Sequence, residues 1–372
     1  KGFGGITSGT PEDKLGIRGS NTTSIFFDNT PVPAENILGE VGDGFKVAMN
    51  VLNNGRFGMG AALAGGLREL IGYTSKHAVD RVQFEKPLSD FHMIKDKVYK
   101  MTTLVYAIES MAYVASAIID VVEDPDCALE CAIVKVFSSD AAQYVVNECL
   151  QIHGGSGFMA SLPIEQYYRD TRILSIFEGT NEILRLFISL VGLQYAGKQL
   201  AQLVSKLRNP LAFPTLALKK MWESRLDAAD KPTLDLHLYS ALHPSLKDGA
   251  DTLEYCVKRL KYMVEIVLQN YGKEVVEHQV VLSNIADMVM QVYAMACVLA
   301  RASRSYCIGL PNSSKEVDIA LCFCYDAKKK VKYCEEEIMD EVMNMMHVTK
   351  RQIADKVFED KAYFPVHPLM RN

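Results

Sequence analysis

Residues 90–120 read DFHMIKDKVYKMTTLVYAIESMAYVASAIID, and this stretch decides the fold. Apolar residues recur in it at alternating spacings of four and three, the pattern of a helix that keeps one face turned toward its neighbours. That period suits a bundle of helices crossing at about 20°. The stripe consists of Ile94, Val98, Met101, Val105, Ile108, Ala112, Ala115 and Ile119.

Other helical patterns lie on both sides of this stretch, separated by turn-forming residues. Together they predict long helices near residues 43–80, 90–121, 127–152 and 180–205. We therefore expect residues 41–205 to form one four-helix bundle.

The remaining segments differ from the bundle in character. Residues 1–40 carry alternating strand residues and prolines, as in Ser24-Ile25-Phe26-Phe27, and read as the end of a β domain. Residues 206–241 break the helical period, and residues 242–372 are helical again, with a stripe of Leu253, Val257, Leu260, Val264 and Val267. The predicted fold is mainly α: a β-domain remnant, a four-helix bundle and an additional C-terminal helical domain.

Composition narrows the functional classes. The 372 residues are 49% hydrophobic, so the chain can bury a sizeable core, and its length suits two or three domains. Its net charge is −5. A pI near 6.0 gives no general basic field for nucleic acid. The nine cysteines are scattered without metal-ligand spacing, so we expect reduced thiols and no metal site. No apolar run is expected to span a membrane. The sequence starts at Lys1 within a strand region, so we expect further chain upstream.

Residues 169–185, RDTRILSIFEGTNEILR, contain the strongest candidate for chemistry. Ile173, Leu174, Ile176 and Phe177 can shield Glu178 from water, and removal from water disfavours the charged form of a carboxyl. Such a glutamate is a candidate general base. Gly179 lets a ligand approach the backbone, and Thr180 can cap the following helix. The plainer alternative is an ordinary helix N-terminus beside a solvated acid.

The segment from Gln151 to Arg185, which opens with QIHGGSGF at 151–158, resembles the second signature region of the acyl-CoA dehydrogenases. Residues 13–22, DKLGIRGSNT, are similar to the end of the middle β domain of that family. The resemblance implies that Glu178 removes the α-proton of a long-chain acyl-CoA while FAD takes the β-hydrogen as hydride. It also implies a homodimer that passes its electrons to an electron-transferring flavoprotein.

The resemblance implies a set of cofactor-binding residues as well. Arg81, Gln83 and Phe84 match an Arg-x-x-Phe motif that reaches the FAD pyrophosphate of the neighbouring subunit, although an arginine at a helix end often only compensates the helix dipole. The backbone of residues 151–155 faces the adenine end in the family, and the turn at 180–182 contacts the same cofactor. The implied residues there are Gln151, His153, Gly154, Gly155, Thr180, Asn181 and Glu182. From the residues alone, the glycines indicate a turn and His153 a packing side chain.

Asn53, Arg56 and Gly179 are the implied substrate-binding residues. Arg56, in Asn53-Asn54-Gly55-Arg56-Phe57, matches a family arginine close to the catalytic glutamate. An ion pair inside the bundle explains an arginine at this place equally well.

The segment 201–225 is basic and rich in leucine, with Glu223 as its one acid. Such a segment either lies in an anionic membrane interface or links two domains. Resemblance to the inner-membrane branch of the family favours peripheral binding to lipid on the matrix face of the mitochondrial inner membrane. The implied membrane residues are Lys206, Arg208, Phe213, Lys219, Lys220, Trp222 and Arg225.

Two branches of the family remain open. Asn53–Gly66 and Leu207-Arg208-Asn209-Pro210 look closer to the very long-chain enzymes, whereas Arg169–Leu174 and Glu182 look closer to the ninth-member paralogue. The first branch implies the first step of mitochondrial fatty-acid β-oxidation, and the second implies work with assembly factors of respiratory complex I. Because the N-terminal helical domain and much of the β domain lie outside this sequence, we expect these 372 residues alone to be a poor enzyme.

Overall fold

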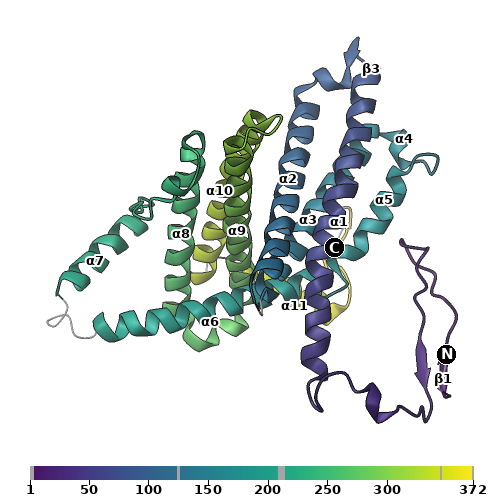
Figure 1. The fold of residues 1–372 in the computed structure, drawn as a ribbon, viewed down its shortest axis with the longest axis horizontal. Helices are drawn as coiled ribbons and strands as arrows, with labels where there is room; N and C mark the ends of the chain where they lie inside the picture. The colour runs from purple at the N-terminus through teal and green to yellow at the C-terminus, as the bar shows by residue number, and fades with distance from the viewer. Residues whose placement is uncertain (1–3, 124–125, 208–213, 344–345, 371–372) are drawn as a thin grey trace. The chain divides into compact units, whose positions relative to one another are not determined.

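The computed structural model describes residues 4–123, 126–207, 214–343 and 346–370, and it is mainly helical (Figure 1). The α-helices are α1 (Gly44–Asp80), α2 (His92–Val121), α3 (Ala128–His153), α4 (Gly155–Phe158), α5 (Ile164–Thr171), α6 (Asn181–Leu207), α7 (Pro214–Ala228), α8 (Lys247–Tyr271), α9 (Gln279–Cys307), α10 (Ser313–Val342) and α11 (His347–Asp360). Short 3-10 helices are η1 (Ala34–Asn36), η2 (Leu88–Asp90), η3 (Arg172–Ser175), η4 (Leu238–Ala241), η5 (Pro244–Leu246) and η6 (Gly272–Glu277). The predicted fold class is confirmed.

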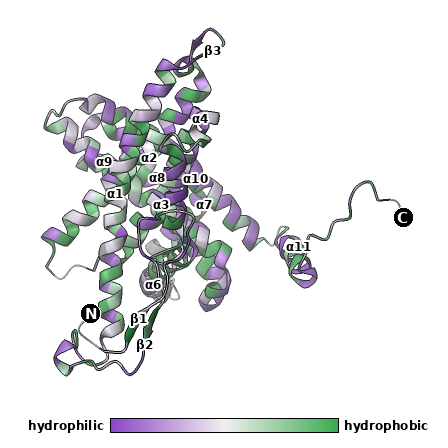
Figure 2. Cartoon of the chain, turned by 90° about the vertical axis from the view of Figure 1, so that its right-hand side faces the viewer, coloured by the Kyte–Doolittle hydropathy of each residue, from purple (hydrophilic) through white to green (hydrophobic). Residues whose placement is uncertain are grey.

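Two short antiparallel pairs make up the described strands. β1 (Ile6–Ser8) pairs with β2 (Ile25–Phe27) in the segment expected to end a β domain. The side chains of β2 are exposed although they are apolar, as the green colour of this strand in Figure 2 illustrates. β3 (Val82–Gln83) and β4 (Lys86–Pro87) form a small hairpin directly after α1.

The helices α1, α2 and α3 pack on one another and form the centre of the bundle. Their observed bounds, and the start of α6, agree with the predicted helices to within a few residues. The predicted stripe of α2 faces the core, since five of its members are buried, namely Met101, Val105, Ile108, Ala112 and Ala115. A Cβ at Gly60 of α1 would lie 2.5 Å from Val134 of α3, so a glycine is needed where these two helices approach.

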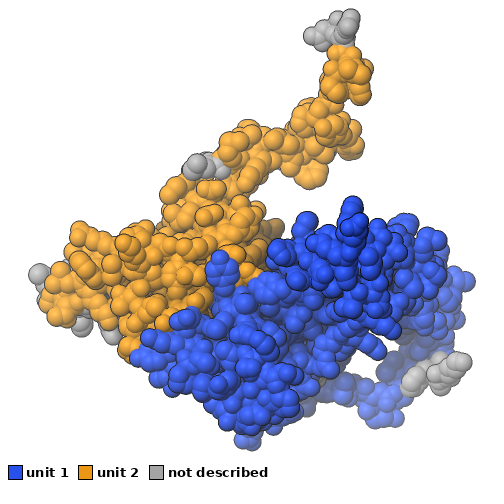
Figure 3. Space-filling view, turned by 90° about the horizontal axis from the view of Figure 1, so that it is seen from above, with its two compact units in different colours: residues 1–188, 238–250, 293–325 blue, residues 189–237, 251–292, 326–372 orange. Residues whose placement is uncertain are grey.

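The chain divides into two compact units, each assembled from separate stretches of sequence (Figure 3). The first unit comprises residues 1–188, 238–250 and 293–325, and the second comprises residues 189–237, 251–292 and 326–372. Because both units are discontinuous in sequence, they do not test the contiguous domains 1–40, 41–205, 206–241 and 242–372, which stay a prediction.

In the second unit, the buried face of α8 differs from the predicted stripe. Leu253 and Val267 are buried as expected, but the fully buried positions between them are Cys256 and Met263. Glu254, Arg259 and Glu265 are buried on the same helix and carry polar contacts. The buried face of α8 is therefore rotated toward these charged residues. The spacing of apolar residues in the sequence does not predict this rotation.

Two helices have the length and composition of a membrane span, contrary to the expectation from the sequence. They are α2 and α9, with 44% and 50% of their apolar windows buried inside the chain. Core helices of this burial pass the same test.

Candidate functional site

Glu178 lies in a turn with unusual backbone geometry in the first unit. The turn follows α5 and η3 and ends where α6 begins at Asn181. Glu178 has a φ of 57° and Gly179 a φ of 93°, so two successive residues adopt left-handed backbone conformations. For a residue other than glycine this costs on the order of 1–2 kcal/mol. Contacts around the turn must hold the glutamate in place.

The Glu178 side chain lies against α1 at Gly55. A Cβ added to Gly55 would lie 2.6 Å from Oε1 of Glu178, so the glycine provides the space for the carboxylate. The other carboxylate oxygen, Oε2, is buried and has no hydrogen-bond partner among the described residues. A buried acceptor without a partner is uncommon and is expected where a bound molecule supplies one. This carboxylate is available to accept a proton.

Arg56 holds the turn from the side of α1. Its side chain is buried, with Nε donating to the Glu178 carbonyl oxygen at 3.3 Å and NH1 donating to Asn53 Oδ1 at 3.0 Å. Burial lowers the pKa of the guanidinium, and the charge of Glu178 opposes that shift. The predicted pair Asn53 and Arg56 is thus adjacent to the candidate base.

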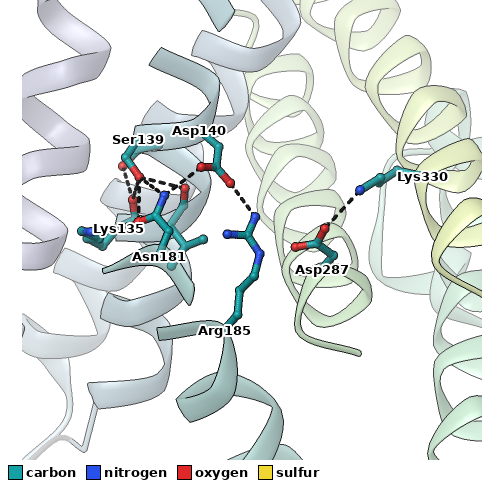
Figure 4. Close-up of polar contacts among 9 residues, drawn as sticks. Lys135, Ser139, Asp140, Asn181, Arg185, Asp287 and Lys330 are labelled. Atoms are coloured by element: carbon teal, nitrogen blue, oxygen red, sulfur yellow. Dashed lines mark hydrogen bonds and ion pairs between the residues drawn. The ribbon is translucent and has the colours of Figure 1, made fainter. Parts of the chain in front are cut away.

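Lys135 holds the same turn from α3, and our sequence analysis missed it. Its side chain is fully buried, and Nζ donates to the Gly179 carbonyl oxygen and to Asn181 Oδ1, both at 2.8 Å. Figure 4 shows Lys135 close to Asn181. Burial lowers the pKa of Lys135 to about 8. The available signal was a single lysine within the otherwise apolar run Cys131-Ala132-Ile133-Val134-Lys135-Val136-Phe137.

The apolar wall predicted around Glu178 is wrong for this chain. Ile173, Ile176 and Phe177 are 36%, 47% and 38% exposed, and Leu174 is half-buried. The positive φ at Glu178 reverses the chain and directs its side chain to α1, away from the preceding apolar residues. The shielding of Oε2 therefore comes from the bundle.

A cavity of about 910 Å³ opens where α1 and α3 end. It brings together five of the predicted cofactor residues, namely Arg81, Gln83, His153, Gly154 and Gly155. A Cβ at Gly154 or Gly155 would meet nothing within 4 Å, so this part of the wall is open backbone. Lys76 and Arg81 contribute two cationic side chains to the lining.

His153 packs in this cavity wall as the plainer reading of the sequence expected. Its ring stacks on those of His77 at 4.2 Å and Tyr73 at 5.4 Å, and Nδ1 lies 2.9 Å from the Cys149 carbonyl oxygen. Its Nε2 is buried without a hydrogen-bond partner in the described chain. Burial, followed by the neighbouring His153, lowers the pKa of His77.

The other predicted cofactor residues lie elsewhere. Phe84 and Gln151 line a smaller cavity of about 330 Å³, which shares Gln83, Leu88 and Ile152 with the larger one. Thr180, Asn181 and Glu182 are instead placed at the Glu178 turn, where Thr180 Oγ1 accepts from the Ile183 amide at 3.4 Å as predicted for a cap. Asn181 bonds Asp140, which precedes Gln151 by about three turns of α3, roughly 16 Å. The predicted cofactor residues of one chain thus form two separate groups, one at the two cavities and one at the Glu178 turn.

The predicted membrane residues fall into three classes. Arg208, Phe213 and the side chain of Lys206 lie outside the described residues. Lys220 does not face solvent, because its ammonium bonds both carboxylate oxygens of Glu265 at 2.8 and 2.7 Å, and the sequence prediction is corrected there. Lys219, Trp222 and Arg225 are exposed, and Lys219 lies 3.6 Å from Glu223.

The cysteines offer no further site. All nine are free thiols, and burial raises the pKa of Cys131 to about 11. In the part of the chain that is described, no group of three or more His, Cys, Asp or Glu side chains is placed to hold a metal ion.

Comparison with known proteins adds two family matches. Residues 42–192 match "Acyl-CoA dehydrogenase, C-terminal domain". Residues 244–363 match "ACAD9/ACADV, C-terminal domain".

Individual relatives agree with these matches. The mitochondrial very long-chain specific acyl-CoA dehydrogenase of Homo sapiens is 43% identical over 89% of this chain and 50% of its own length. A probable acyl-CoA dehydrogenase of Bacillus subtilis is 33% identical over 82% of this chain and 51% of its own length. The crystal structure of a Bacillus anthracis acyl-CoA dehydrogenase complexed with FAD covers 98% of this chain and 65% of its own, with a TM-score of 0.76 and 29% identity. The chain thus spans about half the length of the curated relatives it matches.

Proposed function

The chain belongs to the acyl-CoA dehydrogenase family, and from that premise we propose that the protein dehydrogenates a long-chain acyl-CoA to the trans-2-enoyl-CoA with Glu178 as the base. One observation carries the proposal. Glu178 Oε2 is buried without a hydrogen-bond partner in the described chain, within a turn whose positive φ is costly. Strained backbone and unpaired polar atoms are expected where function requires them.

Glu178 takes the α-proton of the thioester in this reaction. The proton is acidic only if charge developing on the thioester oxygen is stabilised and water is excluded. Buried Arg56 and Lys135 add positive charge around the turn, and each holds one of its carbonyl oxygens. Gly179 has no side chain to keep the substrate away from the backbone.

The residues present fit FAD as the cofactor. Lys76, Arg81 and the open glycine backbone of the larger cavity suit a pyrophosphate, although Asp80 also lines it. The cavity volume of about 910 Å³ suits a cofactor-sized ligand. Arg81, Gln83 and the backbone of residues 153–155 would hold it, with Thr180 to Glu182 contributing at the turn. Bound FAD would accept the β-hydrogen together with its electron pair. The chain supplies the base, the orientation and the dry surroundings.

We also propose a homodimer. The end of α3 that lines the larger cavity lies roughly 16 Å along the helix from Asp140, which bonds Asn181 at the Glu178 turn. We propose that one subunit supplies the Arg81 contact and its partner the Glu178 turn to the same cofactor, as the family resemblance implies. Electrons are proposed to leave through an electron-transferring flavoprotein. The very long-chain relatives support a long-chain substrate.

Replacement of Glu178 by glutamine tests the proposal. The amide is nearly isosteric but cannot accept the α-proton, so turnover in the full-length protein should fall by at least ~10³ with flavin content unchanged. Turnover above a tenth of the wild-type rate, at equal flavin content, would remove Glu178 from the mechanism.

A second candidate function is assembly of respiratory complex I. The match of residues 244–363 to the ACAD9/ACADV C-terminal domain supports this second candidate, because that domain is described for both branches of the family. Affinity purification from mitochondria separates the two: co-purified complex I assembly factors favour the assembly role, and acyl-CoA oxidation without them favours the enzyme.

We propose that the protein binds the matrix face of the mitochondrial inner membrane. The mitochondrial relative and the exposed set Leu218, Met221 and Trp222, next to Lys219 and Arg225, support this. Each basic residue at an anionic surface contributes about 1 kcal/mol. Lys219→Gln with Arg225→Gln should weaken sedimentation with cardiolipin liposomes about tenfold or more. Full sedimentation of the double variant at low salt would exclude this segment as the anchor.

A further inference from the structure

We propose that Lys135 is a positioning residue for the Glu178 carboxylate, because its buried ammonium locks the left-handed turn that aims the side chain at α1. The inference rests on the proposed function, in which Glu178 is the base. Lys135 does not touch the Glu178 carboxylate through any hydrogen bond found in the described chain. It acts through the next residue, since its Nζ bonds the Gly179 carbonyl oxygen at 2.8 Å.

Two buried cations hold two consecutive carbonyl groups of the turn. Arg56 from α1 donates to the carbonyl of Glu178 at 3.3 Å, and Lys135 from α3 donates to the carbonyl of Gly179 at 2.8 Å. The two carbonyl groups belong to the consecutive peptide planes 178–179 and 179–180, so holding both restricts ψ of Glu178 and both φ and ψ of Gly179. This arrangement explains how a glutamate keeps a φ of 57° that is otherwise unfavourable.

The ammonium is itself fixed by the first turn of α6. Lys135 Nζ donates to Asn181 Oδ1 at 2.8 Å, and Asn181 Nδ2 donates to Ser139 Oγ at 2.8 Å and to Asp140 Oδ1 at 2.7 Å (Figure 4). Arg185 bonds the other oxygen of Asp140 at 2.6 Å. Because the members of such a network orient one another, Lys135 has one position available to it.

The charges around Lys135 come from every packed element. Asp140 on α3, Glu178 in the turn and Glu182 on α6 favour the ammonium, whereas Arg56 on α1 opposes it. Burial is the largest influence and lowers the pKa of Lys135 to about 8. The positive charge is therefore present below about pH 8 and is lost as the pH rises through that value.

Lys135→Met in the full-length flavoprotein tests the inference. Methionine fills much of the space without the charge or the donors, so the carboxylate should move and kcat should fall about 10- to 100-fold with KM changed less than about threefold. The kcat–pH profile should change as well, because the variant has no ammonium that loses its charge near pH 8. The alkaline decline near pH 8 should disappear.

A matched control is Lys330→Met. Lys330 lies 3.1 Å from Asp287 in the second unit, so this variant removes a lysine from an ion pair that has no part in the turn (Figure 4). Its kcat and its alkaline decline near pH 8 should equal those of the wild type. If Lys135 contributes only to stability, both variants should have a lower melting temperature, and Lys135→Met should keep the pH profile of the wild type.

Ser139→Ala keeps the test valid if Lys135→Met does not fold. This substitution removes one partner of Asn181 and should lower kcat about three- to tenfold, while amide hydrogen exchange in residues 178–182 becomes faster. Wild-type turnover and exchange in Ser139→Ala would overturn the inference, as would a wild-type pH profile in a folded Lys135→Met protein. If Glu178→Gln retains turnover, the proposed function fails instead.

Discussion

Two buried arginines, Arg56 in the first unit and Arg259 in the second, show how differently the chain treats charge. Arg259 meets both carboxylate oxygens of Glu335 through Nε and NH2, bonds the Asp227 carbonyl oxygen and lies 4.8 Å above the ring of Tyr262. Arg56 donates instead to a backbone carbonyl and an amide oxygen. Its acidic neighbour Glu178 keeps one carboxylate oxygen without a hydrogen bond in the described chain.

The difference separates stability from chemistry. When the donors of a buried arginine bond a carboxylate, the two charges compensate each other. Such an arginine then contributes to the stability of the fold and not to chemistry. A buried carboxylate with one oxygen that makes no hydrogen bond, in a turn of positive φ, destabilises the chain. We expect such a group to be retained because it can accept a proton from a substrate. The following predictions sharpen this contrast.

Arg259→Met should cost the most stability. The substitution leaves Glu335 without its bidentate partner, and breaking a buried pair from one side costs about 3–5 kcal/mol. Urea unfolding at 25 °C measures the loss. The double variant Arg259→Met with Glu335→Leu should recover more than half of it, whereas a double variant as unstable as the single one would trace the loss to packing.

Arg81→Ala should weaken flavin retention at least tenfold and favour the monomer. The guanidinium lines the larger cavity and is proposed to make a charge-assisted contact to pyrophosphate, worth about 1.5–3 kcal/mol. Flavin absorbance after gel filtration and mass by light scattering are both read. A flavin-replete dimer in the variant would mean that Arg81 only compensates the end of α1.

Gly55→Ala should have the smallest effect. It should lower turnover and raise stability. The new Cβ would lie 2.6 Å from Glu178 Oε1, which is the end of a flexible side chain and can move. We expect kcat to fall about tenfold, while alanine inside a helix raises the free energy of unfolding by up to about 1 kcal/mol. Turnover equal to that of the wild type would show that the carboxylate does not need its place against α1.

The sequence allowed much of this picture to be predicted, for physical reasons that also explain its limits. The stripe of α2 and the helix bounds follow from local periodicity, and Glu178 and Arg56 stand within recognisable motifs. The role of Lys135 does not follow from its place in an apolar run alone, because its partners Gly179 and Asn181 lie more than 40 residues away and a lone lysine on a helix usually faces solvent. The rotated core face of α8 depends on ion pairs that hydrophobic spacing does not contain.

The most direct test is Glu178→Gly, with turnover and free energy of unfolding measured on the same preparation. Glycine accepts a φ of 57° without penalty and has no carboxylate, so we expect turnover to fall by at least ~10³ while stability rises by about 1 kcal/mol. Lys361→Gly, at a φ of 51° on the exposed end of α11, is the control and should gain stability without losing turnover. A Glu178→Gly protein that retains more than a tenth of wild-type turnover, or that loses stability while the control gains it, would contradict the account.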